Sequence, residues 1–341
     1  MPASPTTLLS TLLPPALARR QPLSALSSSA FRAFSGQADG ADGLFLDIYN
    51  QGAVLIIYEG RAPRHLNAQA EAQAALEILQ PLGVRAIYLK PFAKDRSKLG
   101  GQLPPIVTDP TPIAPPHGQP LPESLLISEH QWKLEVRLYD GLSTGLFLDQ
   151  RENRRYVHDW TAARLKPNSP PPRILNTFAY TCAFSIAAAT AGAHTTSVDV
   201  SARYLDWGKR NFTHNNLDPA SHHFARMGTL EFLAYAARKK LTYDLIILDP
   251  PTFAAGNKKK GIRPWSSQSD YARLVHDAAA VLAPRGTILA STNTAELCAK
   301  GRLEKEITKG LGHAPRWHKL PAPPKDFAKD KDRFAAAAFS P

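Results

Sequence analysis

The chain has 341 residues, 43% of them hydrophobic, so it can bury a large α/β domain and a smaller one, and it is not a disordered protein. Its formal net charge of +12 indicates attraction to a polyanion, with nucleic acid as the first candidate. Two widely spaced cysteines, Cys182 and Cys298, support neither a disulfide framework nor a zinc site, and no apolar run is long enough to span a membrane. We therefore expect no metal and no membrane partner, and nothing in the sequence predicts the oligomeric state.

Residues 1–38 form a block without Asp or Glu that contains three arginines, Arg19, Arg20 and Arg32. This composition is typical of an organellar transit peptide, although a disordered tail would share it. Arg32 stands just before a candidate processing point near Phe34 or Ser35. The block therefore predicts import into the mitochondrion, with the plastid as the alternative.

A small α+β domain is expected over residues 44–127. Residues 44–58 predict two strands joined by an Asn-Gln-Gly turn, residues 67–80 predict a helix, and residues 85–92 predict another strand. The proline-rich stretch 100–123 then forbids regular strand pairing and indicates an extended linker. The rest of the chain, residues 128–341, is expected to form a second, larger domain.

Strand and helix patterns alternate in the larger domain. Apolar strands are expected at residues 173–178, 195–200, 243–250 and 286–293, with helical patterns between them. This alternation predicts a doubly wound, mostly parallel, Rossmann-like α/β sheet. In such sheets ligands bind beyond the carboxyl ends of the strands, so functional residues are expected directly after each strand.

Two of these strand ends carry informative residues. The loop 179–185 after the first strand lacks the GxGxxG pattern of dinucleotide-binding folds. Asp199 ends the second strand, where an acid can bind ribose hydroxyls, but the same acid could instead cap the following helix. From this residue alone the two interpretations are equally supported.

The third strand ends in an acid followed by two prolines. Proline fixes its own φ and extends the residue before it, so this stretch is expected to hold free backbone carbonyls as a rigid acceptor edge. Such an edge can hydrogen-bond a flipped base that stacks on an aromatic ring. A simple turn would explain the prolines but not the neighbouring acid and aromatic ring. The predicted base-facing residues are Asp249, Pro250, Pro251, Thr252 and Phe253.

A basic loop follows this stretch. Lysines suit phosphate binding and aromatic rings suit base stacking, so the loop is expected to bind RNA. The residues concerned are Lys258, Lys259, Lys260, Arg263 and Trp265.

Several longer stretches together resemble one family. They are DGLSTGLFLDQRENRR (140–155), ILNTFAYTCAFSIAAA (174–189), TTSVDVSARYLDWGKRN (195–211), YDLIILDPPTF (243–253) and DFAKDKDRF (326–334). In this order they are similar to the class I S-adenosylmethionine-dependent methyltransferases that modify guanine N7 or cytosine C5 of bacterial large-subunit ribosomal RNA. The resemblance implies S-adenosylmethionine as cofactor and ribosomal RNA as partner, and it covers roughly residues 128–340.

The resemblance also implies roles for individual residues. Asp199 would hold the cofactor ribose, and Asp249 would face both cofactor and base. The other implied cofactor contacts are Phe147, Asp149, Arg151, Asn176, Phe178, Tyr180 and Thr181. Two positions depart from the family pattern: Cys182 stands where glycine is usual, and Gly228 stands where an acid usually meets the adenine amine.

A missing cysteine indicates which atom is methylated. Methylation of cytosine C5 needs a thiolate that attacks C6, whereas guanine N7 already has a lone pair. The cytosine branch of the family carries that cysteine after the fourth strand, where this chain has Thr292 and Asn293. Guanine N7 is therefore favoured over cytosine C5, with an orienting role for Asp249.

Two other functions are compatible with parts of the sequence. An NAD-dependent enzyme would share the sheet and Asp199, but it leaves the Asp-Pro-Pro stretch unexplained. A non-catalytic RNA-binding or ribosome assembly factor that retained the methyltransferase fold would accommodate Cys182 and Gly228.

Overall fold

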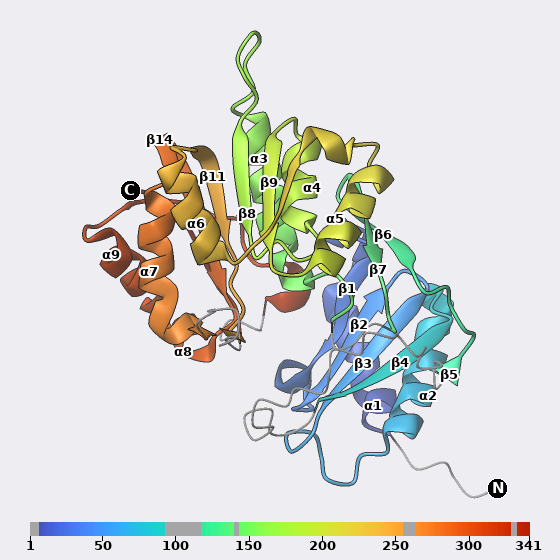
Figure 1. The fold of residues 1–341 in the computed structure, drawn as a ribbon. Helices are drawn as coiled ribbons and strands as arrows, with labels where there is room; N and C mark the ends of the chain where they lie inside the picture. Colours follow the sequence, from blue (N-terminus) through green and yellow to red (C-terminus); the bar gives the residue numbers. More distant parts are fainter. Residues whose placement is uncertain (1–6, 93–116, 140–142, 255–263, 329–332) are drawn as a thin grey trace, which may run out of the picture. The chain divides into compact units, whose positions relative to one another are not determined.

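The computed structural model describes residues 7–92, 117–139, 143–254, 264–328 and 333–341. The chain divides into two compact units (Figure 1). The first comprises residues 1–148 and 324–329, and the second comprises residues 149–323 and 330–341. The division thus falls after Leu148 rather than at residue 128, and much of the expected proline-rich linker lies outside the described residues.

The first unit contains a five-stranded sheet in the order β1-β2-β3-β4-β5. Only β3 and β4 pair in parallel, and Asn67 caps α2 by accepting the N–H groups of Gln69 and Ala70. The elements are α1 (Leu8–Arg20), β1 (Ala30–Ser35), β2 (Leu44–Tyr49), β3 (Gly52–Tyr58), α2 (Ala68–Leu79), β4 (Ala86–Phe92), β5 (His117–Gly118), and the hairpin β6 (Leu125–Glu129) and β7 (Trp132–Val136). The predicted strands β2, β3 and β4 and the predicted helix α2 are confirmed.

The N-terminal segment, residues 7–38, folds as an integral part of this unit. Helix α1 packs against α2, and β1 pairs with β2 at the edge of the sheet (Figure 1). Leu9, Leu13 and Phe34 are fully buried in the same core as β2 and β3. Glu71 of α2 accepts the N–H groups of Leu8 and Leu9 at 2.8 Å and so satisfies the start of α1. The expectation of a transit peptide over residues 1–38 is therefore wrong.

The three arginines of this segment bind carboxylates of the same unit. Arg19 and Arg20 both lie 2.6 Å from Asp39, and Arg32 lies 2.8 Å from Asp47. Burial would raise the pKa of Asp39, but the hydrogen bonds from Arg20 and Arg19 outweigh it and hold that pKa below its usual value. The three arginines thus form ion pairs within the unit. Composition alone could not distinguish arginines with this role from those of a targeting signal.

The second unit contains a seven-stranded sheet in the order β10-β9-β8-β11-β14-β16-β15. The five strands β10, β9, β8, β11 and β14 pair in parallel, whereas β16 runs antiparallel to both of its neighbours. Its strands are β8 (Arg173–Thr177), β9 (His194–Asp199), β10 (His223–Arg226), β11 (Tyr243–Leu248), β14 (Leu282–Thr292), β15 (Arg316–His318) and β16 (Ala335–Ser340). The predicted doubly wound, mostly parallel sheet is confirmed.

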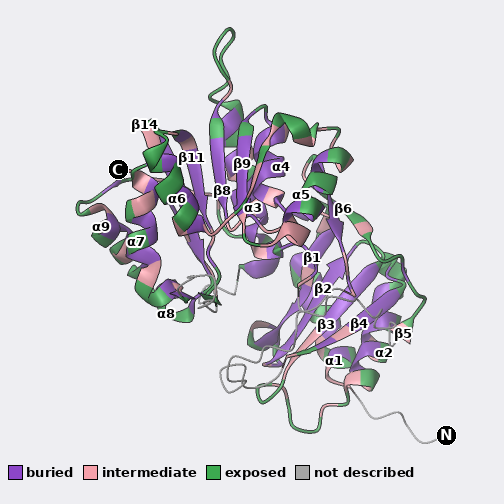
Figure 2. Cartoon of the chain, viewed as in Figure 1, coloured by how far each residue is buried: buried purple, intermediate pink, exposed green. Residues whose placement is uncertain are grey.

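Helices cover both faces of this sheet because its central strands are apolar on both sides. Leu245 and Ile247 of β11 pack towards α3 and α4, whereas Ile246 and Leu248 pack towards α6 and α7. Figure 2 shows the central strands buried and the outer sides of the helices exposed. The helices are α3 (Arg151–Ala162), α4 (Ala183–Thr190), α5 (Ala202–His214), α6 (Thr229–Arg238), α7 (Ser267–Ala279), α8 (Ala295–Cys298) and α9 (Arg302–Leu311).

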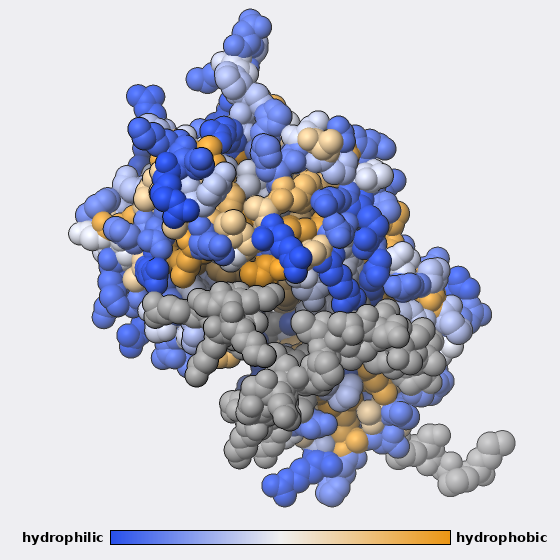
Figure 3. All heavy atoms as spheres, in the orientation of Figure 1, coloured by the Kyte–Doolittle hydropathy of each residue, from blue (hydrophilic) through white to orange (hydrophobic). Residues whose placement is uncertain are grey.

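The surface of the protein is largely polar. Hydrophilic side chains cover much of the outer face shown in Figure 3. Within the described part of the chain, no helix is both long enough and apolar enough to cross a membrane.

Candidate functional site

The candidate site lies at the edge of the second sheet where the parallel strands β8, β9, β11 and β14 end. Neighbouring parallel strands bring their carboxyl ends to the same edge, so residues distant in sequence meet there. Asp199 follows Val198 on β9, and Asp249 directly follows β11.

The loop after β8 has an unusual backbone. Phe178, Tyr180 and Cys182 have positive φ angles of 52°, 49° and 63°. Residues other than glycine rarely adopt this left-handed region, and strain of this kind is concentrated at functional sites. The Tyr180 ring packs edge-on against Tyr204, with 4.4 Å between centroids. Thr181 is buried, and its carbonyl accepts a hydrogen bond from Asn211 at 2.9 Å, which ties the loop to α5.

Asp199 connects this loop to the start of α5. Its Oδ2 accepts the Tyr180 N–H and its Oδ1 accepts the Ser201 N–H, both at 2.9 Å. Burial raises the pKa of Asp199, and these backbone donors oppose that rise. The carboxylate therefore has a structural role in organising the loop. Each oxygen also has a second lone pair with which it could accept a ligand hydroxyl.

Asn176 lies inside the sheet rather than on the loop. It is 2% exposed, and its Nδ2 donates to Ser185 Oγ at 3.0 Å. Ser185 Oγ in turn lies 2.7 Å from Ser197 Oγ, so the three side chains join β8, α4 and β9. The structure gives Asn176 a buried bracing role through its Nδ2, and its contact with the cofactor stays a prediction.

The Cys182 side chain fits into the fold because α5 has a glycine, Gly208, opposite it. The thiol is fully buried, and a Cβ at Gly208 of α5 would lie only 2.4 Å from Cys182 Sγ. Burial raises the pKa of Cys182 to about 12, which keeps the thiol protonated at neutral pH. The side chain thus occupies space beside α5, and it is not a candidate nucleophile.

Asp249 has a strongly raised pKa at this edge of the sheet. Ser291 Oγ of β14 donates to Asp249 Oδ1 at 2.7 Å. Burial is the main cause that raises the pKa of Asp249 to about 6. The nearby Asp149 carboxylate acts in the same direction, and the hydrogen bonds from Ser291 and Gln150 and the charge of Arg154 oppose the rise. A carboxyl group that titrates near neutral pH at a strand end is a common feature of functional sites.

The segment after Asp249 is clamped from two sides. The Pro251 carbonyl accepts hydrogen bonds from Trp265 Nε1 at 2.9 Å and from Ser267 Oγ at 2.8 Å. Thr252 Oγ1 donates to Asn293 Oδ1 at 2.8 Å, which joins the segment to the end of β14. The expectation of free carbonyls along this segment is therefore wrong for Pro251, because its oxygen holds the turn in place.

The two aromatic side chains of this region have different environments. Trp265 is only 8% exposed and packs against Phe178, with 5.9 Å between centroids, so it braces the segment instead of offering a ring to RNA as expected. Phe253 is 63% exposed, and its short strand β12 (Phe253–Ala254) pairs with β13 (Trp265–Ser266). Lys258, Lys259, Lys260 and Arg263 lie outside the described residues.

Three of the expected cofactor contacts come from the stretch 140–155, where the chain passes from the first unit to the second. Asp149 and Arg151 begin the second unit, at the start of α3, and Arg151 is 1% exposed. Phe147 belongs to the first unit, and its ring is 48% exposed.

At the second departure from the family pattern, an acid lies nearby. Gly228 precedes α6, and a Cβ placed there would lie 3.8 Å from Glu231 Oε2. The Met227 N–H donates to the Asp199 carbonyl at 3.1 Å, so this segment adjoins the end of β9. A carboxylate is therefore present close to position 228 although that residue is glycine.

Two residues at this edge, Gln150 and Ser291, were not identified from sequence. Gln150 Nε2 donates to Ser291 Oγ at 2.9 Å, although the two residues are 141 positions apart. Gln150 lies inside the resembling stretch 140–155, and Ser291 lies near the end of a predicted strand. Position at a strand end was the signal that could have indicated Ser291, whereas Asn293 was named for the cysteine that it replaces.

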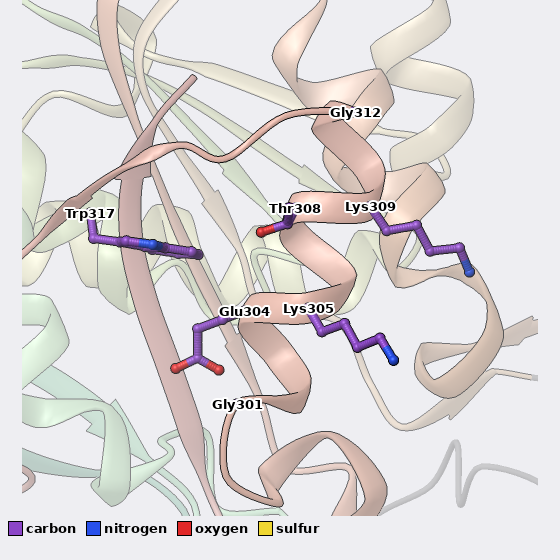
Figure 4. Close-up of a pocket in the computed structure, with 7 residues that line it drawn as sticks. All are labelled: Gly301, Glu304, Lys305, Thr308, Lys309, Gly312 and Trp317. Atoms are coloured by element: carbon purple, nitrogen blue, oxygen red, sulfur yellow. The ribbon is translucent and has the colours of Figure 1, made fainter.

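A separate surface pocket of about 660 Å³ lies along α9 (Figure 4). Trp317, Glu304 and Thr308 face one another across it, whereas Lys305 and Lys309 point away from the indole ring (Figure 4). No predicted site residue is among those that line it.

Comparison with known proteins gives the family. The family model of S-adenosylmethionine-dependent methyltransferases matches residues 116–332. The "Putative ribosomal RNA large subunit methyltransferase YwbD" of Bacillus subtilis is 37% identical over 287 residues, which are 84% of this chain and 66% of that protein. "Ribosomal RNA large subunit methyltransferase K/L" of Pseudoalteromonas translucida is 34% identical over 252 residues, 73% of this chain. The chain spans 32% of the length of this second relative.

Solved structures agree with this result. The crystal structure of "SMU.776, a putative methyltransferase complexed with SAH" has a TM-score of 0.79 and 29% identity, and the match covers 97% of this chain and 80% of that one. A "putative sam-dependent methyltransferase from Streptococcus mutans" has a TM-score of 0.78 and 27% identity, with the same coverage.

These relatives correct the expected localisation. The YwbD and K/L relatives are bacterial proteins, and residues 7–38 are a built part of the first unit. Import into the mitochondrion, or into the plastid, was therefore a wrong prediction. The Rossmann-like fold and S-adenosylmethionine as the cofactor are confirmed. The chain belongs to the family of S-adenosylmethionine-dependent methyltransferases.

Proposed function

We propose that this protein transfers the methyl group of S-adenosylmethionine to a base of large-subunit ribosomal RNA, at guanine N7. Two relatives carry names that specify large-subunit ribosomal RNA as their substrate. The net charge of +12 supports an anionic partner of this kind. The observation that carries the proposal is Asp249, held by Ser291 at the sheet edge where ligands of such folds bind.

The residues at this edge fit the cofactor. S-adenosylmethionine supplies a positively charged sulfonium whose methyl group is open to displacement. The Asp149 and Asp249 carboxylates are close enough for one to raise the pKa of the other, which suits a site for a cation. Asp199 would accept ribose hydroxyls, and the strained backbone of Phe178 and Tyr180 would lie along the cofactor.

The environments of the cysteines support a nitrogen target. Cys182 is fully buried, with a pKa raised to about 12. Cys298 is 8% exposed, and its Sγ lies 3.5 Å from the Thr292 carbonyl, inside the fold at the end of β14. Attack on cytosine C6 needs an accessible thiolate, so both environments favour guanine N7 over cytosine C5.

The transfer to N7 needs positioning more than acid–base chemistry. The N7 lone pair forms the new N–C bond while the C–S bond breaks towards sulfur, so positive charge moves onto the guanine ring and no proton leaves. An ionised Asp249 beside the ring would stabilise this charge. The exposed ring of Phe253 would stack on the base.

The test is methylation of an unmodified large-subunit ribosomal RNA transcript, followed by digestion and mass spectrometry of the nucleosides. 7-Methylguanosine is the expected product, and 5-methylcytidine would overturn the choice of atom. Cofactor binding without transfer to any RNA would instead support the non-catalytic RNA-binding factor. Asp249→Ala should lose transfer while it keeps most of its affinity for S-adenosylmethionine, measured by isothermal titration.

A further inference from the structure

Four side chains form one hydrogen-bonded row that ends at Asp249. Asn153 Nδ2 donates to Gln150 Oε1 at 2.8 Å, Gln150 Nε2 donates to Ser291 Oγ at 2.9 Å, and Ser291 Oγ donates to Asp249 Oδ1 at 2.7 Å. Asn153, Gln150 and Ser291 are 6%, 3% and 0% exposed. Hydrogen bonds in such a buried place are stronger than the same bonds in water.

The direction of every bond in this row is determined. A serine hydroxyl has one hydrogen, and Ser291 already accepts a hydrogen from the Gln150 amide, so its own hydrogen points to Asp249. Asn153 fixes the orientation of the Gln150 amide in the same way. The ionised Asp249 therefore accepts the Ser291 hydrogen at Oδ1, and the Gln150 amide also hydrogen-bonds the carboxyl group and lowers its pKa. Oδ2 is the oxygen that we expect to face the ligand.

A backbone hydrogen bond and three ionisable groups also surround this row. Tyr271 of α7 donates its hydroxyl to the Ser291 carbonyl at 2.9 Å, which holds this end of β14. Three ionisable groups influence the Asp249 carboxyl group: Asp149 from the segment before α3, Arg154 from α3, and Tyr271 from α7. Asp149 disfavours the ionised carboxylate, and Arg154 together with the Ser291 hydroxyl favours it.

We infer that Ser291, oriented by Gln150 and Asn153, is a positioning residue that turns Asp249 Oδ2 towards the target base. This inference rests on the proposed function. Without the Ser291 hydroxyl, the Asp249 carboxyl group can rotate and lose a hydrogen bond to its ionised form. The rate of methyl transfer then falls, although no contact to RNA or cofactor is removed.

The test compares Ser291→Ala with Ser291→Thr, which keeps a hydroxyl, and with Gln150→Leu, which removes the amide that donates to Ser291 and also hydrogen-bonds the Asp249 carboxyl group. Methyl transfer to the unmodified large-subunit ribosomal RNA transcript is measured against pH. Ser291→Ala should lower kcat about 10- to 100-fold and leave KM for RNA within about twofold. The pH midpoint of kcat should rise by about one unit relative to the wild type, because the ionised carboxylate loses a donor.

Ser291→Thr should keep kcat and its pH midpoint near the wild-type values. Gln150→Leu should shift kcat and the pH midpoint in the same direction as Ser291→Ala. Thr161→Val is the matched control, since Thr161 is fully buried and its hydroxyl bonds only to the Val157 carbonyl of its own helix. A wild-type kcat and pH midpoint in Ser291→Ala overturn the inference. An equal loss in Thr161→Val also overturns it, because a general loss of packing would then explain the effect.

A readout without RNA separates this inference from the proposed function. The Asp249 carboxyl group can be titrated by carbon-13 NMR in the full chain and assigned with Asp249→Asn. An upward shift of the Asp249 midpoint in Ser291→Ala supports the row even if the wild type methylates no RNA. An unchanged midpoint overturns the role of Ser291, whereas a failure of methyl transfer in the wild type counts only against the proposed function.

Discussion

Gly208 of α5 provides the space that the Cys182 thiol occupies. A Cβ at Gly208 would lie 2.4 Å from Cys182 Sγ and 2.9 Å from Cys182 Cβ, closer than packed atoms approach. Cys182 also has a φ of 63°, a conformation that glycine adopts without strain. The two positions are therefore coupled: a side chain can be present at one or at the other.

Gly208→Ala is expected to lower the free energy of unfolding by about 1 to 3 kcal/mol, because its methyl group collides with the thiol. In a Cys182→Gly background the same change should be neutral or stabilising, since alanine favours the helix. Chemical denaturation of both single variants and the double variant measures the coupling. Additive effects would show that the two residues do not compete for space.

A chain that begins at Ser35 should fail to fold its first unit. It lacks α1 and most of β1, and with them the buried Leu9, Leu13 and Phe34. We expect loss of solubility or of cooperative thermal unfolding. The milder variant Leu13→Ala should lower the free energy of unfolding by about 2 to 5 kcal/mol, because the side chain is fully buried. A stable, cooperatively folded truncation would contradict the structural role of this segment.

Asp249→Asn should stabilise the protein in a pH-dependent way. Burial raises the pKa of Asp249 from 3.8 to about 6, so the folded chain binds the proton more tightly than the unfolded chain. Stability from this group is present below pH 4 and is lost as the pH rises through 6. The variant should therefore gain about 1 to 3 kcal/mol at pH 8 and little at pH 4, measured by denaturant unfolding. A gain that does not depend on pH would contradict the raised pKa.

Glu231 is expected to replace the acid that is absent at position 228. Its Oε2 lies 3.8 Å from the place of a Cβ at Gly228, within reach of the adenine amine that an acid at position 228 would bind. Glu231→Gln should weaken binding of S-adenosylmethionine about tenfold in isothermal titration. Gly228→Asp combined with Glu231→Ala should restore the affinity, and Glu306→Gln serves as a control on α9. Wild-type affinity in Glu231→Gln would exclude this role.

Sequence patterns predicted the second sheet well and the N-terminal segment badly. Apolar runs such as 243–248 are long, uniform and bounded, so they predict buried parallel strands without further information. The composition of residues 1–38 was ambiguous, because a leader and a helix whose arginines meet internal carboxylates use the same residue types. Only the positions of Asp39 and Asp47 distinguish the two.

The position of two acids at the edge of the sheet was predictable for a similar reason. Asp199 and Asp249 could be located because an acid directly after a buried strand marks the ligand edge of the sheet. Asn176 and Trp265 were expected to contact ligands, and the structure shows that Asn176 Nδ2 and Trp265 Nε1 donate inside the fold, to Ser185 and Pro251 respectively. Alternation along a strand does not tell which polar side chain finds a buried partner.

By itself, then, the sequence determined the order of strands and helices, the acids at the strand ends and the family resemblance, since these depend on local pattern and short spacing. The row from Asn153 through Gln150 and Ser291 to Asp249, and the match of Cys182 to Gly208, were decided only by the tertiary structure. Apart from the neighbours Gln150 and Asn153, their members are distant in the chain and come together only when parallel strands end at one edge and helices pack on both faces. Hydrogen bonds and steric exclusion act over a few ångströms, so they exist only after folding has set those distances.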